Sequence, residues 1–377
     1  MRPMRWREAG VAIAAIFLLS RSALVLAAAF LENNVPLSYH GNTFSTAPIL
    51  RSLTGTDSIY YLGIAAEGYH SQPVYQAFRD WAFFPLYPIV TKVVSILTFG
   101  DVALAGVLVA NLAFVAALAV IYRLSLSYID HDRSVRTLAF VAFAPGAVAF
   151  AMAYSDSLYL LLSAGAFLAV MRGHWWLMGL LYALATLTRL PGLLLGIPLA
   201  IAIAEQNGGW RSAAAWRAAA SLRSPRLLWL AAGPIAFGLF MAYLGATFGD
   251  PLGMFTAQQA WSDIGRPETG NSTPVVDRFD PLVLLLVGTL VLYLFLFVFR
   301  RKDRLPASAT ALAVVSVITA LASGRLQSIA RYLAVAWPFD WLLANRRAAW
   351  FELTGLAFFG ALFVIHAMLH FTQALAP

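Results

Sequence analysis

The chain of 377 residues contains no cysteine and few charged residues, and both deficits restrict its chemistry. Without cysteine it has neither disulfide bonds nor a thiolate nucleophile. Charged residues make up 12% of the chain and hydrophobic residues 60%, and the mean hydropathy of +0.74 lies above the range of soluble domains. Walker A, GxGxxG, nucleophile-elbow and HExxH motifs are also missing, so soluble nucleotide chemistry has no support in the sequence.

Apolar segments recur along almost the whole chain, and this pattern predicts a polytopic membrane protein. They extend from Val11 to Ala374 and leave no polar stretch long enough for a separate soluble domain. We therefore expect one all-α integral-membrane domain over residues 1–377. The first apolar run, residues 10–31, is too long for a signal-peptide core and lacks a cleavage site, so it is expected to remain as the first helix.

The net charge of +8 is spread in clusters between the apolar segments, which indicates membrane topology instead of nucleic-acid binding. The positive-inside rule assigns these clusters to the cytoplasm. They are Arg2, Arg5 and Arg7, then Arg133 and Arg136, residues 211–226, residues 300–304, and Arg346 with Arg347. The long acidic loop that follows the first helix and the loop at residues 249–280 are then expected outside.

One apolar segment, Phe83 to Phe99, must lie along the outer interface under this scheme. A crossing there would export Arg133 and Arg136 and would invert every later cluster. The two prolines in its first turn and its aromatic residues suit the headgroup region. The first extracytoplasmic loop, with its interfacial helices, therefore covers residues 32–100, and about 11 crossings remain.

Three of the predicted hairpins are too short to cross a bilayer twice. The first two hold about 35 and about 30 residues, and the third spends several residues on a polar turn, whereas two full spans need about 40. Their outer turns are "YSDS" (154–157), "TLTRLPG" (186–192) and "SGRLQSIARY" (323–332). Because a helix of about 14 residues rises only about 21 Å, these turns are expected to end in a depression below the outer surface.

Charged residues at that depth must face a cavity or a partner, since lipid tails solvate them poorly. Asp156, Arg189, Arg325 and Arg331 are therefore candidates for a functional pocket. A structural pairing, such as Asp156 with an arginine, is the alternative. Arg21, in the middle of the first helix, either snorkels to the interface or lines the cavity.

Residues 56–88 of the first loop carry three acids, Asp57, Glu67 and Asp80, the last of them beside the aromatic run "WAFFPLYP". Asp57 opens the helix-like run "DSIYYLGIAAEGY", so an N-cap is the structural alternative to a catalytic role. Glu67 falls in the last turn of that helix, where an acid opposes the helix dipole, and is expected to be solvated.

His366 and His370 stand four residues apart on the last predicted helix, a spacing that could bind a metal. No acidic residue lies near them in the sequence, and histidines are common at membrane interfaces. We therefore expect no metal site and no cofactor.

The run "DSIYYLGIAAEGY" followed by "AFFPLYP" resembles the signature of the PIG-V mannosyltransferases and their bacterial relatives, which are integral-membrane glycosyltransferases of the GT-C class. Further blocks resemble the family in its order: "AYSDSLYLLLSAGAFLAV", "GLLYALATLTRLPGLLL", "FGDPLGMFTAQQAW" and "LQSIARYLAVAWPF". The resemblance covers about residues 50–345. It departs at Thr56, where the family usually has tryptophan, and after Tyr69, where some relatives carry a glutamate and this chain offers only Asp80.

The resemblance implies a GT-C-like fold and inverting transfer of a hexose, in the first place mannose, from a polyprenyl-phosphate carrier to an acceptor hydroxyl at the extracytoplasmic face. Asp57 would be the general base, with Asp80 or Asp156 as a secondary acid. The substrate-binding residues would be Arg189, Arg325, Gln327, Arg331, Tyr332 and Tyr69. A carboxylate that takes the acceptor proton and cations that hold the donor phosphate are what this chemistry requires.

The implied partners are the lipid-linked donor, a lipid, glycan or protein acceptor, and the membrane, but no nucleic acid. The bacterial relatives imply the plasma membrane as the location. A transporter of lipid-linked or anionic substrates is the main alternative, although such proteins often show two similar halves and this sequence has no internal repeat. A non-catalytic GT-C-like subunit with a vestigial pocket is a third possibility.

Overall fold

The computed structural model describes residues 6–34, 44–45, 47–74, 79–221, 226–262, 288, 305–322, 328–344 and 349–372. Within these ranges every regular element is a helix, so the predicted all-α class is confirmed. The elements are α1 (Trp6–Asn34), α2 (Pro48–Leu53), α3 (Ser58–Glu67), η1 (Asp80–Ala82), α4 (Leu86–Ser95), η2 (Ile96–Thr98), α5 (Val102–Ser125), α6 (His131–Ala142), η3 (Ala147–Phe150), α7 (Asp156–Met171), α8 (Trp175–Thr186), α9 (Leu190–Leu194), α10 (Gly196–Gln206), α11 (Ala213–Ala219), η4 (Arg226–Ala231), α12 (Ala232–Phe248), α13 (Gly253–Ser262), α15 (Ala307–Ala322), α16 (Ile329–Ala334), α17 (Pro338–Ala344) and α18 (Ala349–Phe371).

Four helices in the described ranges are long and apolar enough to cross a membrane. They span Arg7–Asn34, Val102–Ser125, Arg226–Phe248 and Leu353–Phe371. Helices α7, α8 and α15 are apolar but shorter, with 16, 12 and 16 residues, as the short hairpins predicted. The total of about 11 crossings stays a prediction.

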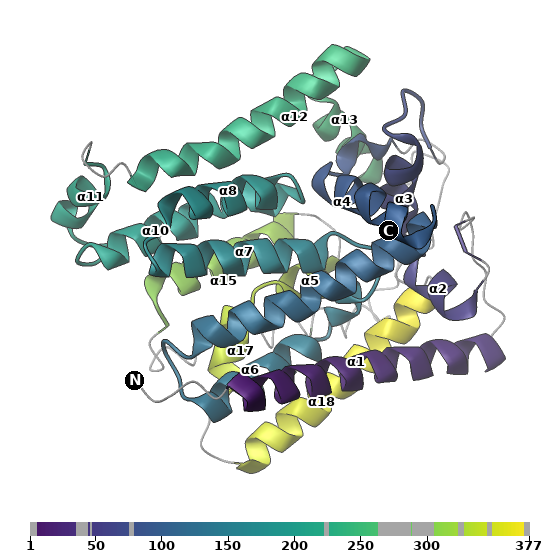
Figure 1. Cartoon of the computed structure of the whole chain (residues 1–377), viewed down its shortest axis with the longest axis horizontal. Helices are drawn as coiled ribbons and strands as arrows, with labels where there is room; N and C mark the ends of the chain where they lie inside the picture. The colour runs from purple at the N-terminus through teal and green to yellow at the C-terminus, as the bar shows by residue number, and fades with distance from the viewer. Residues whose placement is uncertain are drawn as a thin grey trace.

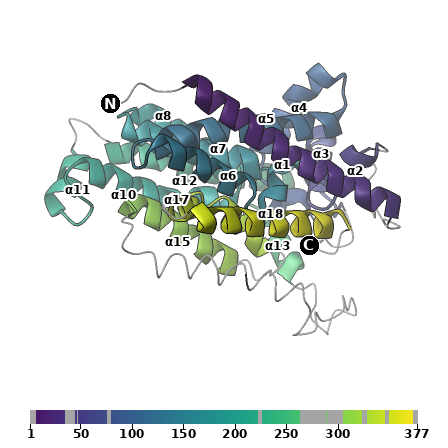
Figure 2. The ribbon, with the colours of Figure 1, turned by 90° about the horizontal axis from the view of Figure 1, so that it is seen from below.

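Figure 1 shows the long helices side by side, with α5 and α7 packed together near the centre of the molecule. Helices α1 and α18 lie against each other along one side, in Figure 1 and again in Figure 2. Helices α2, α3, α4 and α13 gather at one end of the molecule and α11 lies at the other. Helix α4 has only 10 residues and stays at the end where α3 lies, as expected for an interfacial segment.

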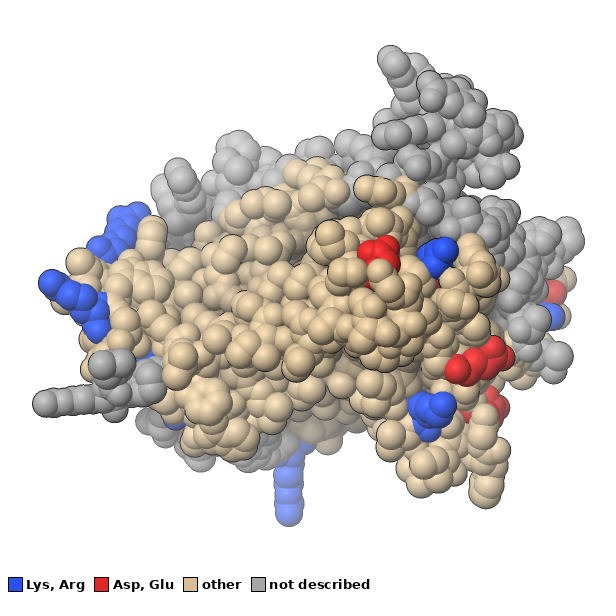
Figure 3. Space-filling model, turned by 90° about the horizontal axis from the view of Figure 1, so that it is seen from above, with Lys and Arg blue, Asp and Glu red and all other residues tan. Residues whose placement is uncertain are grey.

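Charge is distributed unevenly between the two ends (Figure 3). Basic side chains occupy the end formed by α11, where Arg211 and Arg217 are exposed. Acids appear at the opposite end, where Glu67 and Asp101 are exposed, together with some basic residues. Between them, the described part of the middle of this face is almost wholly uncharged, with one basic side chain at its lower edge, as expected of a surface that faces lipid tails.

A buried segment without regular α-helix, residues 143–155, connects α6 to α7 through η3. All of its residues after Phe143 are buried. Helix α16 passes so close to this segment that a Cβ atom at Gly146 would overlap the backbone of Ala330, so only glycine fits there. This close approach places the next residue of α16, Arg331, beside the start of α7.

Candidate active site

Two acids and two arginines from four separate segments meet at the ends of the short helices. Asp57 precedes α3, Asp156 is the first residue of α7, Arg189 lies between α8 and α9, and Arg331 lies in α16. We call these four residues the charge cluster. The polar turns of the three short hairpins therefore converge, because each contributes one charged residue to this cluster.

Arg331 bridges the two acids of the charge cluster. Its Nε donates to Oδ2 of Asp156 at 2.9 Å, its Nη2 forms an ion pair with the same oxygen at 2.8 Å, and its Nη1 donates to Oδ2 of Asp57. Arg189 donates through Nη1 to the other oxygen of Asp156. Asp156 is wholly enclosed, whereas the side chain of Asp57 is 16% exposed and is the most accessible of the four.

Aromatic side chains frame both arginines. The guanidinium of Arg331 lies 4.2 Å from the ring centre of Tyr154, and that of Arg189 lies 4.9 Å from the ring centre of Tyr332. Such cation–π contacts support a desolvated cation without neutralising it. The two positive and two negative charges cancel within the cluster, which limits the cost of burying them.

The backbone at Thr56 directs Asp57 toward Arg331. Thr56 has a left-handed conformation with φ of 54°, which is uncommon for a β-branched residue, and its hydroxyl bonds that of Tyr154. Although Asp57 stands at the N-cap position of α3, its side chain makes no capping hydrogen bond. The N-cap alternative is therefore wrong, because the carboxylate of Asp57 binds Arg331 instead.

Asp80 belongs to a second group of side chains, which we call the His70 bridge. Its carboxylate accepts from Nδ1 of His70 at 2.9 Å and from the backbone N–H of His70 at 3.1 Å, while Nε2 of His70 lies 2.9 Å from Glu67. These bonds raise the pKa of His70, and burial raises the pKa of Asp80. No hydrogen bond between described residues joins Asp80 to the charge cluster.

The other residues singled out in the sequence lie in different places. Tyr332 packs on Arg189 and thus adjoins the charge cluster. Tyr69 instead donates to the carbonyl of Phe83 at 2.6 Å and packs against aromatic residues of α12. Arg325 and Gln327 lie outside the described residues. Glu67 is exposed, as expected, although it bonds His70.

Sequence reasoning missed several neighbours of the charge cluster. Tyr61 bonds Ser155, the residue before Asp156, at 2.8 Å. His370, near the end of α18, lies within electrostatic reach of Asp57, Asp156 and Arg331, and its buried Nδ1 has no hydrogen-bond partner among the described residues. Its spacing from His366 suggested only a metal site, because the sequence does not reveal that α18 ends beside the first loop.

In the part of the chain that the structure describes, no three histidine, aspartate or glutamate residues gather as metal ligands would. The expectation that His366 and His370 form no metal site stays a prediction.

Comparison with known proteins gives one family and several distant structures. The sequence model of the family described as mannosyltransferase (PIG-V) matches residues 12–201, which is just over half of the chain. Among curated proteins, none matches the chain.

Solved structures of an oligosaccharyltransferase from Archaeoglobus fulgidus are similar at low identity. The complex with zinc and sulfate gives a TM-score of 0.47 at 15% identity, with 92% of this chain and 53% of that chain covered. The complex of the archaeal enzyme AglB with an inhibitory peptide and a dolichol-phosphate gives 0.45 at 13% identity, with 95% and 56% covered. This chain thus spans about half the length of those proteins, and the likeness is too distant to support conclusions about mechanism.

Proposed function

The chain belongs to the mannosyltransferase (PIG-V) family, and we propose that it transfers a hexose, in the first place mannose, from a polyprenyl-phosphate-linked donor to an acceptor hydroxyl with inversion. The family's description states glycosyl transfer as its activity. The donor, the stereochemistry and the extracytoplasmic face are parts of the proposal. The charge cluster is proposed as its active site.

The observation that carries the proposal is that only one of the two carboxylate oxygens of Asp57 has a hydrogen-bond partner among the described residues. Its Oδ2 accepts from Arg331, and no described residue donates a hydrogen bond to its Oδ1. Because its side chain is also the most accessible of the cluster, Oδ1 can accept a proton from an acceptor hydroxyl. Arg331 would hold the carboxylate in a fixed orientation for that transfer.

Arg189 is the better of the two clustered arginines for the donor phosphate. Arg331 contacts the two acids through its Nε and both terminal nitrogens, whereas Arg189 donates to the described residues through Nη1 alone. The other N–H groups of Arg189 remain for a phosphate oxygen, which a guanidinium binds through paired hydrogen bonds. Tyr332, packed on this guanidinium, would limit its movement. Arg325 and Gln327 stay proposed as further ligands of the donor, and Tyr69 as a more distant one.

In the proposed reaction, the acceptor oxygen attacks the anomeric carbon while its proton passes to Oδ1 of Asp57. The bond from the anomeric carbon to the phosphate oxygen breaks, and its electron pair leaves with the polyprenyl phosphate. Arginine stabilises that charge, so strong protonation of the leaving group is not needed. One essential carboxylate then suffices.

The other two acids take supporting roles in this scheme. Both oxygens of Asp156 are bound by arginine and the side chain is enclosed, so we propose that it holds Arg189 and Arg331 in place. Asp80 is bound to His70 and is proposed to order the first loop. The end of the molecule that carries α2, α3 and α4 would face away from the cytoplasm, because the exposed arginines of the α11 region lie at the other end.

The test is a transfer assay with purified protein in detergent, radiolabelled polyprenyl-phosphate-mannose and a membrane lipid extract. Wild type should move the label to a new product, whereas a transporter would leave it on the donor. Asp57→Asn keeps the shape of the side chain but removes the base, so turnover should fall about a hundredfold or more while donor binding is retained.

Glu67→Gln is the matched control, since it neutralises an exposed acid at the other end of α3. It should transfer sugar at close to the wild-type rate. An Asp57→Asn variant as active as wild type would show that another group removes the proton.

A further inference from the structure

The buried segment at residues 143–155 leaves two carbonyl groups that depend on side chains from other helices. The carbonyl of Phe150 accepts from Nη2 of Arg21 at 3.0 Å and from the hydroxyl of Ser157 at 2.9 Å. The carbonyl of Ala151 accepts from Nδ2 of Asn111 at 3.1 Å. Non-helical backbone within a membrane protein needs such internal donors, because lipid supplies none.

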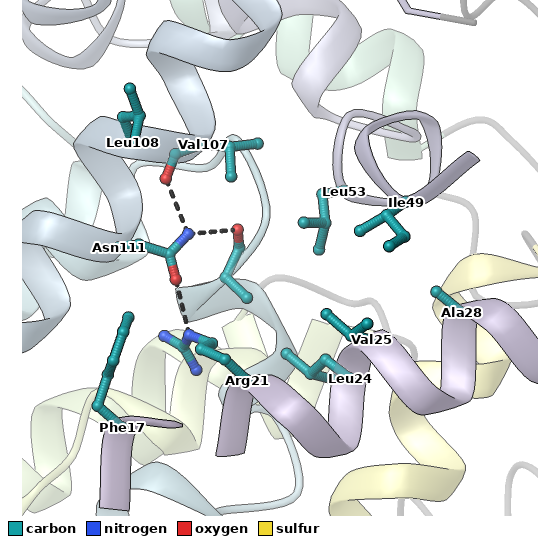
Figure 4. A pocket seen from close by; sticks show the side chains of 11 residues that line it. Phe17, Arg21, Leu24, Val25, Ala28, Ile49, Leu53, Val107, Leu108 and Asn111 are labelled. Atoms are coloured by element: carbon teal, nitrogen blue, oxygen red, sulfur yellow. Dashed lines mark hydrogen bonds between the residues drawn. The ribbon is translucent and has the colours of Figure 1, made fainter. Parts of the chain in front are cut away.

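Arg21 and Asn111 form one unit, seen at one end of a cavity of about 280 Å³ between α1, α2 and α5 (Figure 4). Nε of Arg21 donates to Oδ1 of Asn111 at 2.7 Å, which fixes the orientation of the amide. The other side of the amide therefore donates, to Val107 at 2.8 Å and to Ala151. The sequence predicted that Arg21 would snorkel to the interface or line the cavity of the charged turns; instead it lines this cavity, whose lining includes no residue of the charge cluster.

Aromatic stacking connects the same unit to the segment. The guanidinium of Arg21 lies 4.5 Å from the ring centre of Phe114, and this ring stacks on that of Phe150 at 5.0 Å. In the described part of the chain, the hydrogen-bond partners of Arg21 are all neutral. Arg21 therefore acts here through the fixed arrangement of its guanidinium N–H donors and not through an ion pair with an acid.

We propose that Arg21 and Asn111 are positioning residues for the charge cluster. They hold the carbonyls of Phe150 and Ala151 and so fix the direction of the chain as it approaches Tyr154 and Asp156. Tyr154 carries Arg331 on its ring and bonds Thr56, and Asp156 binds both arginines. A shift of this segment would therefore misplace Asp57 relative to the donor phosphate, which is an effect on turnover more than on binding. The inference rests on the proposed function.

Asn111→Asp tests the unit with the smallest change of shape. The carboxylate still accepts from Arg21 but cannot donate to Ala151 or Val107. We expect backbone hydrogen exchange of residues 150–157 to rise about tenfold or more. Turnover should fall about tenfold or more, which is a larger change than that of the donor KM. Arg21→Lys, which keeps the charge but loses the fork, should change exchange and turnover in the same direction.

Ser20→Ala is the matched control, because Ser20 accepts from Arg21 at 3.3 Å but touches neither carbonyl of the segment. It should match wild type in both measurements. Unchanged exchange in Asn111→Asp and Arg21→Lys would overturn the proposal, and so would faster exchange with unchanged turnover. If wild type transfers no sugar, the proposed function fails, whereas the exchange result still decides whether this pair holds the segment.

Discussion

In the charge cluster each acid is paired with a residue far away in the sequence, whereas the His70 bridge joins close neighbours. Arg331 stands 175 residues from Asp156 and 274 from Asp57. His70 stands 10 residues from Asp80 and 3 from Glu67. The first group therefore exists only when the whole fold is assembled, while the second requires only the local structure of one loop.

The two groups also differ in their contact with solvent. Asp156 and Asp80 are both buried, but their partners differ: the side chains of Arg189 and Arg331 are 7% and 10% exposed, whereas that of His70 is 34% exposed. Water can therefore replace a lost partner of His70 but not of the two arginines. We conclude that the charge cluster is a fixed scaffold, and that the His70 bridge responds to pH.

The largest expected effect follows from neutralising the enclosed acid. Asp156→Asn leaves two arginines buried with one negative charge fewer, so the free energy of unfolding should fall by about 3–5 kcal/mol. Thermal unfolding in detergent would measure it.

The same substitution in the other group, Asp80→Asn, is the matched comparison. An amide oxygen still accepts from His70, and His70 can be hydrated, so the loss should stay near about 1 kcal/mol. Equal losses at the two positions would remove the contrast between the groups.

A smaller effect is expected from Arg189→Lys, which keeps the charge but loses the planar fork. The lysine can pair with Asp156 or with a phosphate, but not with both in the same geometry. We expect the KM for the lipid-linked donor to rise about tenfold, which corresponds to the loss of one charged hydrogen bond, while the protein folds. Steady-state transfer at varied donor concentration gives the value. A normal donor KM would remove Arg189 from the phosphate site.

The smallest expected effect is the pH response of the His70 bridge. Its two carboxylates raise the pKa of His70, so protonation stabilises the folded loop. This contribution is complete below the pKa of the unfolded chain and is lost as pH rises through the raised pKa. Burial also raises the pKa of Asp80, so the folded loop binds this proton more readily than the unfolded chain does, and this too favours the folded loop at lower pH.

Hydrogen exchange of residues 69–74 and 79–82, corrected for the intrinsic rate, should be about two- to fivefold faster near pH 8 than near pH 6. His70→Gln should remove this dependence and leave the exchange of α7 unchanged. A pH response that persists in His70→Gln would assign it to another group.

Much of the fold and part of the site could be predicted from the sequence. Segment length and hydropathy predict helices, and the shortness of three hairpins predicts that Asp156, Arg189 and Arg331 lie at one depth. The family resemblance, confirmed by the matching family model, indicates the activity class. These properties depend on composition and spacing, which a sequence displays directly.

The pairing of the charges could not be predicted, because it depends on packing. That Arg331 reaches both acids requires the close passage of α16 past Gly146. The side chain of Asp57 does not cap its helix, and the preceding residue, Thr56, has a left-handed backbone conformation. A β-branched residue rarely adopts this conformation, so the sequence does not predict it. The proposed role of Arg21 likewise depends on backbone carbonyls that accept hydrogen bonds from side chains of distant helices, which only the folded chain reveals.

The shortness of α8 has a consequence for the membrane itself. With 12 residues it rises about 18 Å, against a hydrocarbon layer of about 30 Å, and its exposed Trp176 and Leu180 would face lipid. A bilayer beside so short a helix accommodates by becoming thinner. Arg189, just beyond its end, would then meet lipid headgroups that stand closer to the midplane than elsewhere. Lipids with longer chains would resist this thinning. The free energy of thinning the host membrane would then add to the free energy needed to bring a lipid-linked sugar to the site.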